Sequence, residues 1–196
     1  MTDQSTETKS RIMEVARVLF ANNGFDGTSV REIARLAEVN VASVNYHFAG
    51  KEKLFHEILL KGHADCSADI QSMALAGANL EDVLVEIFRY FQTKSHDLLS
   101  HFKMMMSTDQ KIVPAGEDMG PPGGKAIVEI IIKETGKNVT EEDLHWALKS
   151  LFSHTIHMSL MYNCCFKNNA VPYSSREDIE KGIRRLTRIV LKELKV

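Results

Sequence analysis

The stretch from Thr28 to Lys53 reads TSVREIARLAEVNVASVNYHFAGKEK, and its pattern decides the fold of the chain. It predicts two short helices joined by a tight turn, over about residues 29–48, and a further helix that begins at Lys51. The first short helix is apolar along one side. The second has only a narrow apolar edge, so most of its surface is not needed for packing and can contact a partner.

Capping residues fix where the two short helices begin. Ser29 followed by Glu32 forms a capping box, and Asn40 is a favourable N-cap for the second helix. The apolar edge of the second helix is formed by Val41, Val44 and Phe48.

The other faces of the second helix carry small or hydrogen-bonding side chains. Steps of 100° per residue place Ser43 and Tyr46 nearly opposite the apolar edge. This division is typical of a helix-turn-helix, in which the second helix lies in the major groove of double-stranded DNA. We therefore expect Ser43 and Tyr46 to contact base edges or the sugar-phosphate backbone, with the helix N-terminus at Asn40 facing phosphate.

Composition is that of an ordinary globular protein. The chain has 196 residues, 44% apolar and 26% charged, with a net charge of −2. No apolar run approaches the ~18 residues of a membrane span, and the start MTDQSTETKS lacks a signal-peptide core, so we expect a cytoplasmic protein without membrane contact. The three cysteines, Cys66, Cys164 and Cys165, indicate reduced thiols rather than a disulfide framework.

Charge limits how the chain could attract DNA. Residues 1–60 contain seven Lys or Arg and eight Asp or Glu residues. Non-specific attraction to phosphate should then be weak, and base contacts and dimerisation would supply much of the affinity.

Helical periodicity continues through the rest of the chain, and no useful strand pattern interrupts it. Capping pairs at Asn79, Thr140 and Ser175 open further helices, which the apolar spacing carries over about 80–91, 141–167 and 176–194. Shorter helices are expected over 98–106 and 126–135. Between these two, residues 109–124 hold three of the four prolines and predict a loop.

Residues matching a known family run through this N-terminal region: Phe20, Gly24-Phe25, Thr28-Ser29-Val30, Ile33-Ala34, Val39-Asn40, Val44, Tyr46-His47-Phe48, Lys51-Glu52 and Leu54-Phe55. Over about residues 8–60 the chain resembles the N-terminal domain of the TetR (tetracycline repressor-like) family. The resemblance implies an all-α fold, with a three-helix DNA-binding domain at 8–60 followed by a helical-bundle ligand-binding and dimerisation domain at 61–196. It also implies a homodimer, formed through the last two long helices, on a palindromic operator.

The resemblance implies further DNA contacts, and the chain differs from the family at two positions. It implies Asn45 and His47 as contacts, Lys51 as a phosphate ligand and Arg31 as a base or phosphate contact. The family commonly has Gly in the turn where this chain has Glu38, and a left-handed Glu38 would cost about 1–2 kcal/mol. The family often has an aromatic residue at the position of Asn45, whose amide can bond adenine through N6 and N7.

An aromatic and methionine-rich set in the C-terminal part could be core or could line a pocket for a small apolar or amphipathic effector. The candidate pocket residues are Phe88, Arg89, Phe91, His101, Phe102, Met105, His154, Met158, Met161 and Tyr162. Together with the family resemblance, these candidate pocket residues predict a repressor. Binding of the effector would release this repressor from DNA.

Two alternatives remain open at this point. His145, His154, His157, Cys164 and Cys165 are residue types that bind soft metals, so a metal- or redox-responsive regulator is possible. However, His157 and Cys164 would lie about 10 Å apart along one helix. The other alternative is a DNA-binding protein that a protein partner controls. We expect no resident metal or cofactor, and no enzyme activity, because phosphate-loop, GxSxG and HExxH motifs are missing from the sequence.

Overall fold

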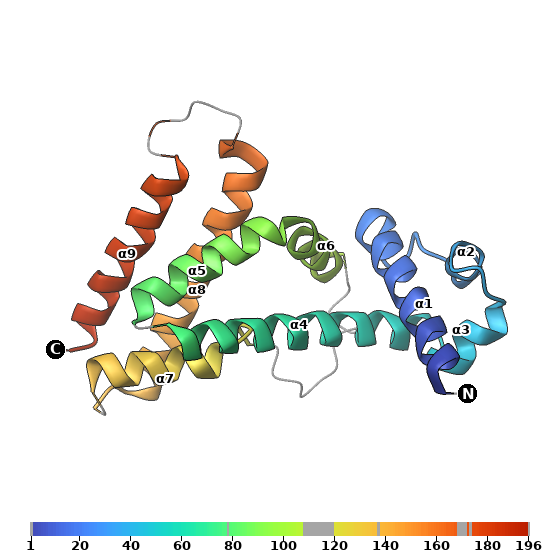
Figure 1. Cartoon of the computed structure of the whole chain (residues 1–196), viewed down its shortest axis with the longest axis horizontal. Helices are drawn as coiled ribbons and strands as arrows, with labels where there is room; N and C mark the ends of the chain where they lie inside the picture. The colour runs from blue at the N-terminus through green and yellow to red at the C-terminus, as the bar shows by residue number, and fades with distance from the viewer. Residues whose placement is uncertain are drawn as a thin grey trace. The chain divides into compact units, whose positions relative to one another are not determined.

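The fold comes from a computed structural model, which describes residues 2–77, 79–107, 120–136, 138–167, 172 and 174–195. Within these residues every regular element is a helix, as the sequence predicts (Figure 1). Two compact units can be distinguished: unit 1 is Met1–His63 with His96–Asp118, and unit 2 is Ala64–Ser95 with Met119–Val196. None of the described helices combines the length and the apolar character needed to cross a bilayer.

Unit 1 contains α1 (Thr2–Asn23), α2 (Val30–Leu36), α3 (Val41–Phe48), the first half of α4 (Lys51–Ala76) and most of α6 (Ser95–Met106). Three stacked or edge-on rings, those of Phe20, Phe25 and Phe55, lie within its core with centroids 4.9–5.9 Å apart. Such a cluster buries large apolar surfaces at one point, which fixes the angles between the helices that carry the rings.

The helix α6 extends unit 1 beyond the segment that the sequence predicted as residues 8–60. Met104 of α6 is fully buried among the core side chains of α1 to α4. This contact joins segments that lie far apart in the chain, so local periodicity could not reveal it. The predicted domain limits themselves remain a prediction.

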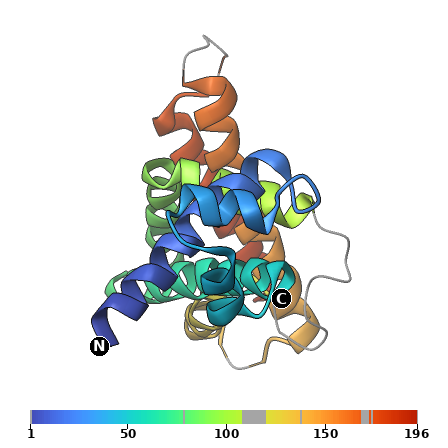
Figure 2. The same ribbon diagram turned by 90° about the vertical axis from the view of Figure 1, so that its right-hand side faces the viewer.

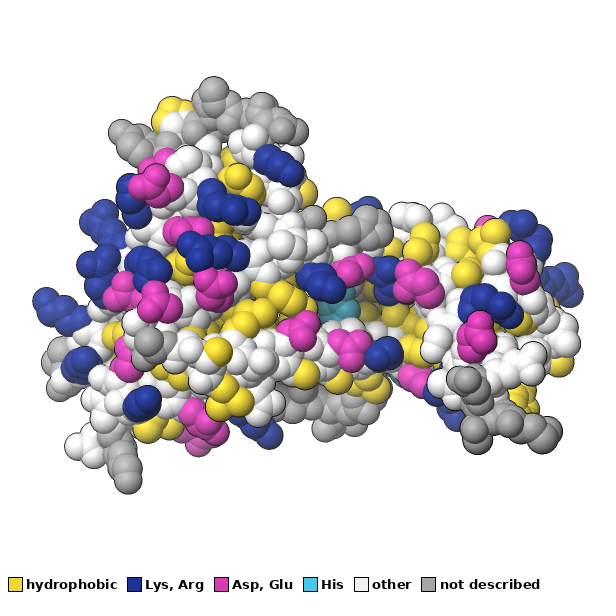
Figure 3. Space-filling view, in the orientation of Figure 1, with side chains coloured by type: hydrophobic (Ala, Val, Ile, Leu, Met, Phe, Trp, Pro, Cys, Tyr) yellow, Lys and Arg dark blue, Asp and Glu magenta, His cyan; other side chains and the backbone are white. Residues whose placement is uncertain are grey.

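Unit 2 contains the second half of α4, α5 (Leu80–Thr93), α7 (Gly124–Thr135), α8 (Glu141–Met161), the π-helical turn η2 (Tyr162–Phe166) and α9 (Arg176–Glu193). Helices α5, α8 and α9 pack on one another (Figures 1 and 2). Acidic and basic side chains are interspersed over α9 (Figure 3), where Arg184 pairs with Asp82 of α5 at 2.6 Å. Hydrogen bonding to Arg184 lowers the pKa of the Asp82 carboxyl.

The predicted capping residues open their helices. Ser29, Asn40, Asn79, Thr140 and Ser175 each accept a hydrogen bond from the backbone N–H three residues ahead. The break expected near Lys94 separates α5 from α6. Most of the predicted loop 109–124 lies outside the described residues.

A half-buried histidine of unit 1 lies against the backbone of α4. His101 of α6 is half-buried, and its Nδ1 lies 3.1 Å from the position that a Cβ on Gly62 of α4 would take. Glycine at position 62 therefore lets the imidazole approach the α4 backbone. Burial, together with the nearby charge of His63, lowers the pKa of His101.

We predict that acid destabilises the protein partly through His101. Between its ordinary value of about 6.5 and the lower value in the folded protein, the unfolded chain binds the proton more tightly, so the free energy of unfolding falls as the pH falls. In His101→Gln this decline between pH 7 and pH 5 should be shallower than in wild type, measured by urea unfolding. An identical slope in the two proteins would contradict the prediction.

Candidate nucleic-acid interface

The turn between α2 and α3 sets the angle at which α3 leaves its support. Val39 N–H donates to the carbonyl of Ala34 at 2.9 Å, and Glu38 N–H donates to the carbonyl of Arg35 at 3.3 Å. These two bonds form a Schellman motif, which requires a left-handed residue at its centre. Glu38 takes that conformation with φ of 54°, so the turn keeps the left-handed geometry for which the resembling family commonly has Gly.

Helix α3 is attached to unit 1 by two side chains. Val44 and Phe48, which were predicted for the apolar edge, are 0% and 3% exposed in the core of unit 1, together with Phe20 and Ile33. Lys9 of α1 lies over the Phe48 ring at 5.4 Å from its centroid, and it also pairs with Glu57 of α4. Because only one edge of α3 is buried, the rest of the helix is presented at the surface.

Asn40 and Ser43 form the N-terminal cap of α3. The Asn40 Oδ1 accepts from the Ser43 backbone N–H at 2.7 Å and from the Ser43 hydroxyl at 3.0 Å. Ser43 is half-buried, so its side chain points away from the core less fully than the sequence predicted. The reason is the bond to Asn40, which turns the hydroxyl toward the cap.

The remaining predicted contacts of α2 and α3 differ in exposure. Tyr46 is 83% exposed, Asn45 and Arg31 are exposed, and His47 is half-buried with its ring centroid 5.2 Å from that of Tyr46. The exposed face of α3 therefore presents an amide and a phenol. No Asp, Glu, Lys or Arg occurs between residues 40 and 48, so this face is uncharged.

Lys51 has a structural role that the sequence did not indicate. Its Nζ donates to the carbonyls of Phe25 at 2.9 Å and Thr28 at 3.1 Å, and lies 4.1 Å from the centroid of the Phe25 ring. An ammonium group has three donors, so two of them tie the start of α4 to the segment between α1 and α2. Whether the same group also binds phosphate stays a prediction.

Val41 and Ala42 were not predicted as outward residues. The spacing assigned Val41 to the buried edge of α3, but it is 39% exposed, and Ala42 is exposed beside it. Val39 packs against the core in its place. Val41 is the first residue of α3, at the end of the helix. The core of unit 1 covers Val41 less completely than it covers Val44 and Phe48.

The ten candidate pocket residues are divided between the two units. His101, Phe102 and Met105 belong to unit 1, and the other seven belong to unit 2. Within unit 2, Phe88 and Phe91 are core residues at 0% and 3% exposure, with the Phe88 ring centroid 6.2 Å from that of Tyr162. The remaining members of unit 2 that lie on α8, namely His154, Met158 and Met161, are half-buried.

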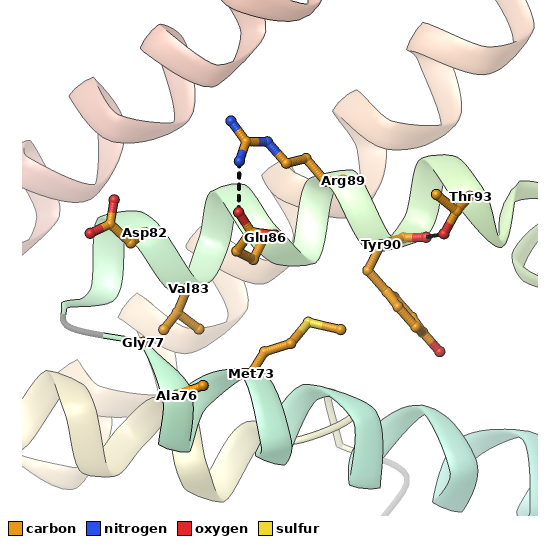
Figure 4. A pocket seen from close by; sticks show the side chains of 9 residues that line it. All are labelled: Met73, Ala76, Gly77, Asp82, Val83, Glu86, Arg89, Tyr90 and Thr93. Atoms are coloured by element: carbon orange, nitrogen blue, oxygen red, sulfur yellow. Dashed lines mark hydrogen bonds and ion pairs between the residues drawn. The ribbon is translucent and has the colours of Figure 1, made fainter.

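A groove in unit 2 lies between the end of α4 and α5 (Figure 4). It has a volume of about 470 Å³ and shares only Arg89 with the predicted set. Arg89 binds both carboxylate oxygens of Glu180 at 2.7 and 2.8 Å, and Glu86 at 2.7 Å. The groove is lined by Met73, Ala76, Gly77, Asp82, Val83, Glu86, Arg89, Tyr90 and Thr93.

The His and Cys residues considered for a metal do not converge. Among the residues that the structure describes, no three His, Cys, Asp or Glu side chains could hold one ion together. Cys164 is exposed in η2, whereas burial raises the pKa of the Cys66 thiol to about 12. A thiol with so high a pKa stays protonated and unreactive at neutral pH.

We predict that Glu38→Gly stabilises unit 1. Glycine removes the cost of a left-handed Glu, so the free energy of unfolding should rise by roughly 0.5–1 kcal/mol after the greater flexibility of glycine in the unfolded chain is deducted. The control is Glu52→Gly in the first turn of α4, where glycine should lower stability. Urea unfolding measures both, and a loss of stability in Glu38→Gly would contradict the account of the turn.

We predict that Lys51→Met destabilises the protein by about 1–3 kcal/mol, because two charge-assisted hydrogen bonds are lost while the aliphatic stem is kept. Lys53→Met, at an exposed position of the same helix, should change stability by less than about 0.5 kcal/mol. Thermal unfolding followed by circular dichroism compares the two. Equal effects would mean that the carbonyl contacts of Lys51 contribute little.

Comparison with known proteins agrees with this geometry. Residues 12–58 match the family model described as bacterial regulatory proteins, tetR family. The chain is 43% identical over 67 residues to a Bacillus subtilis (strain 168) protein named "Probable HTH-type transcriptional regulator YttP", which covers 34% of this chain and 32% of that protein. It is 30% identical over 87 residues to the HTH-type transcriptional repressor NicS of Pseudomonas putida, covering 44% and 41%.

The aligned segments thus span about a third to two fifths of these relatives. Over almost the whole chain, the similarity to known proteins is one of fold. The crystal structure of a protein described as a TetR-family transcription regulator, from Shewanella sp. PV-4, aligns with a TM-score of 0.71 and 19% identity over 93% of this chain and 97% of that one. The N-terminal segment 12–58 therefore matches the tetR family of bacterial regulatory proteins, and the chain as a whole shares the fold of the Shewanella structure.

Proposed function

We propose that this chain is a DNA-binding transcriptional regulator, most simply a dimeric repressor that a small apolar or amphipathic effector releases from a palindromic operator. The observation that carries the proposal is the presentation of α3. Val44 and Phe48 hold the helix at 0% and 3% exposure, while Tyr46 on the opposite side is 83% exposed. A helix held by one edge can enter the major groove without unfolding its support.

The side chains on α3 suit base reading more than phosphate binding. The Asn45 amide can donate to and accept from adenine at N6 and N7, and Tyr46 can reach a base edge or a phosphate with its hydroxyl. Ser43, His47 and the exposed Arg31 lie on the same two helices and belong to the proposed contact set. The backbone N–H groups at the start of α3, next to Asn40, favour a phosphate oxygen.

Phosphate attraction should be modest for this protein. Residues 1–60 carry one more acidic than basic residue, and the ammonium of Lys51 already bonds two carbonyls. Binding should therefore depend on specific contacts and on two copies acting together, as in a two-fold dimer whose recognition helices lie about 34–36 Å apart. If Lys51 also contacts phosphate, its loss should reduce the salt dependence of binding by about one unit.

Two exposed apolar residues support the proposed homodimer. Trp146 of α8 is 50% exposed and Ile189 of α9 is 55% exposed, on the two helices that the resemblance assigns to dimerisation. Ile179, Ile183 and Val190 of α9 are buried in the same unit, so Ile189 lies off the core-facing side. An exposed apolar side chain on such a helix is a reasonable contact for a second copy.

Effector control is proposed from the connection between the units. Helix α4 contributes residues to both, so a change in unit 2 can reach the unit that carries α3 along one continuous helix. A coupling of about 1–3 kcal/mol would lower operator affinity by about 5–150-fold. The repressor sense of the proposal follows the name of the Pseudomonas putida relative.

The proposal is tested by selecting duplexes from a random pool and measuring affinity for the selected sequence by fluorescence anisotropy. We expect a palindromic sequence, and we expect Asn45→Ala combined with Tyr46→Ala to weaken binding at least about tenfold, because base contacts of this kind are worth about 1–3 kcal/mol each. The thermal midpoint should change little, since both side chains are exposed.

The control is Gln71→Ala, at an exposed position on α4 in unit 2. This variant should bind the selected duplex as wild type does. Failure to enrich any sequence, or full affinity in the Asn45 and Tyr46 double variant, would overturn the proposed function or its assignment to α3.

A further inference from the structure

We propose that Val41 recognises the 5-methyl group of a thymine in each operator half-site. This inference rests on the proposed function and names a feature of the DNA sequence that the protein selects. It starts from an apolar side chain at an unexpected place. Val41 is 39% exposed at the first position of α3, although periodicity assigns it to the buried edge.

Val41 belongs to the same face of α3 as the polar contact residues. The exposed positions are 41, 42, 45 and 46, which recur at i, i+1, i+4 and i+5 and therefore lie along one side of a helix. Val44 and Phe48 are almost fully buried, whereas Val41 keeps 39% of its surface exposed. A DNA duplex that meets Asn45 and Tyr46 would meet Val41 as well.

Thymine offers the matching chemistry. Its 5-methyl group is the only apolar group on the base edges of the major groove, and valine can contact it but cannot form hydrogen bonds with its side chain. Against cytosine or adenine, the same side chain would cover a polar edge without satisfying it. Ala42, small and exposed beside Val41, leaves room for the base edge to approach the helix.

Spacing along α3 relates this thymine to a second base. Val41 and Asn45 are four residues apart, which is about 6 Å along the axis at 1.5 Å per residue. Base pairs follow one another every ~3.4 Å, so the two side chains reach positions about two base pairs apart. If Asn45 binds adenine, each half-site should contain that adenine and a methyl-bearing thymine within about two steps.

Deoxyuridine tests the methyl group alone, because it differs from thymidine only by that group. In the selected duplex, each thymine is replaced in turn, symmetrically in both half-sites, and the affinity of the full-length protein is measured. Burial of one methyl-sized group is worth ~0.8 kcal/mol, or about fourfold, so one pair of replacements should weaken wild-type binding by about 15-fold.

In Val41→Ala the penalty at that thymine should shrink to about twofold or less, while other positions behave as in wild type. The matched control is Val18→Ala, because Val18 of α1 has the same 39% exposure and lies outside α3. That variant should keep the full methyl penalty. A double-mutant cycle of protein and DNA changes isolates the contact from any general effect on affinity.

Three results would overturn this inference. If wild type binds the selected duplex but no thymine is sensitive to loss of its methyl group, the proposed function stands and the role of Val41 fails. If Val41→Ala keeps the full penalty, another residue reads the methyl group. If no duplex is enriched at all, the proposed function and this inference fail together.

Discussion

Burial of one edge of α3 is the constraint on which the rest of unit 1 depends. Val44 and Phe48 are nearly inaccessible, and their partners include the ring cluster of Phe20, Phe25 and Phe55. Because a well-packed core has few voids, these two side chains fix both the depth and the rotation of α3. Everything proposed for the outer face follows from that rotation, including the exposure of Tyr46 and Val41.

Two backbone devices complete the positioning of α3. The left-handed Glu38 turns the chain between the helices, and the Asn40 side chain caps the first turn through Ser43. Lys51 then secures the start of α4 by bonding the carbonyls of Phe25 and Thr28. Asn40, Ser43 and Lys51 thus support α3 and also belong to the predicted contact set, whereas Val41, Asn45 and Tyr46 are assigned to the proposed reading surface alone.

Local patterns predicted most of unit 1. Capping pairs located the helix starts, since each needs only residues three apart, and the turn at Glu38 followed from the break between two helical periods. The same patterns failed for Val41, because exposure at a helix end depends on how far the supporting surface extends. They also missed the carbonyl contacts of Lys51, which join residues more than twenty positions apart, and the burial of Met104 in the core of unit 1.

Unit 2 was less predictable for the same reason. An apolar and aromatic composition describes a core and a pocket equally well, and only packing separates the buried Phe88 from Trp146, which is 50% exposed. The groove beside Arg89 is lined mainly by side chains of mixed polarity from α4 and α5, which no single sequence feature marks.

The most direct test of the central claim is ultraviolet cross-linking of the protein to a selected duplex that carries 5-iodouracil, followed by mass spectrometry of the tryptic peptides. Cleavage after Arg35 and Lys51 places all of α3 in one peptide. The account predicts that this peptide, residues 36–51, carries the cross-linked nucleotide. Cross-links found only in peptides from other parts of the chain would contradict it.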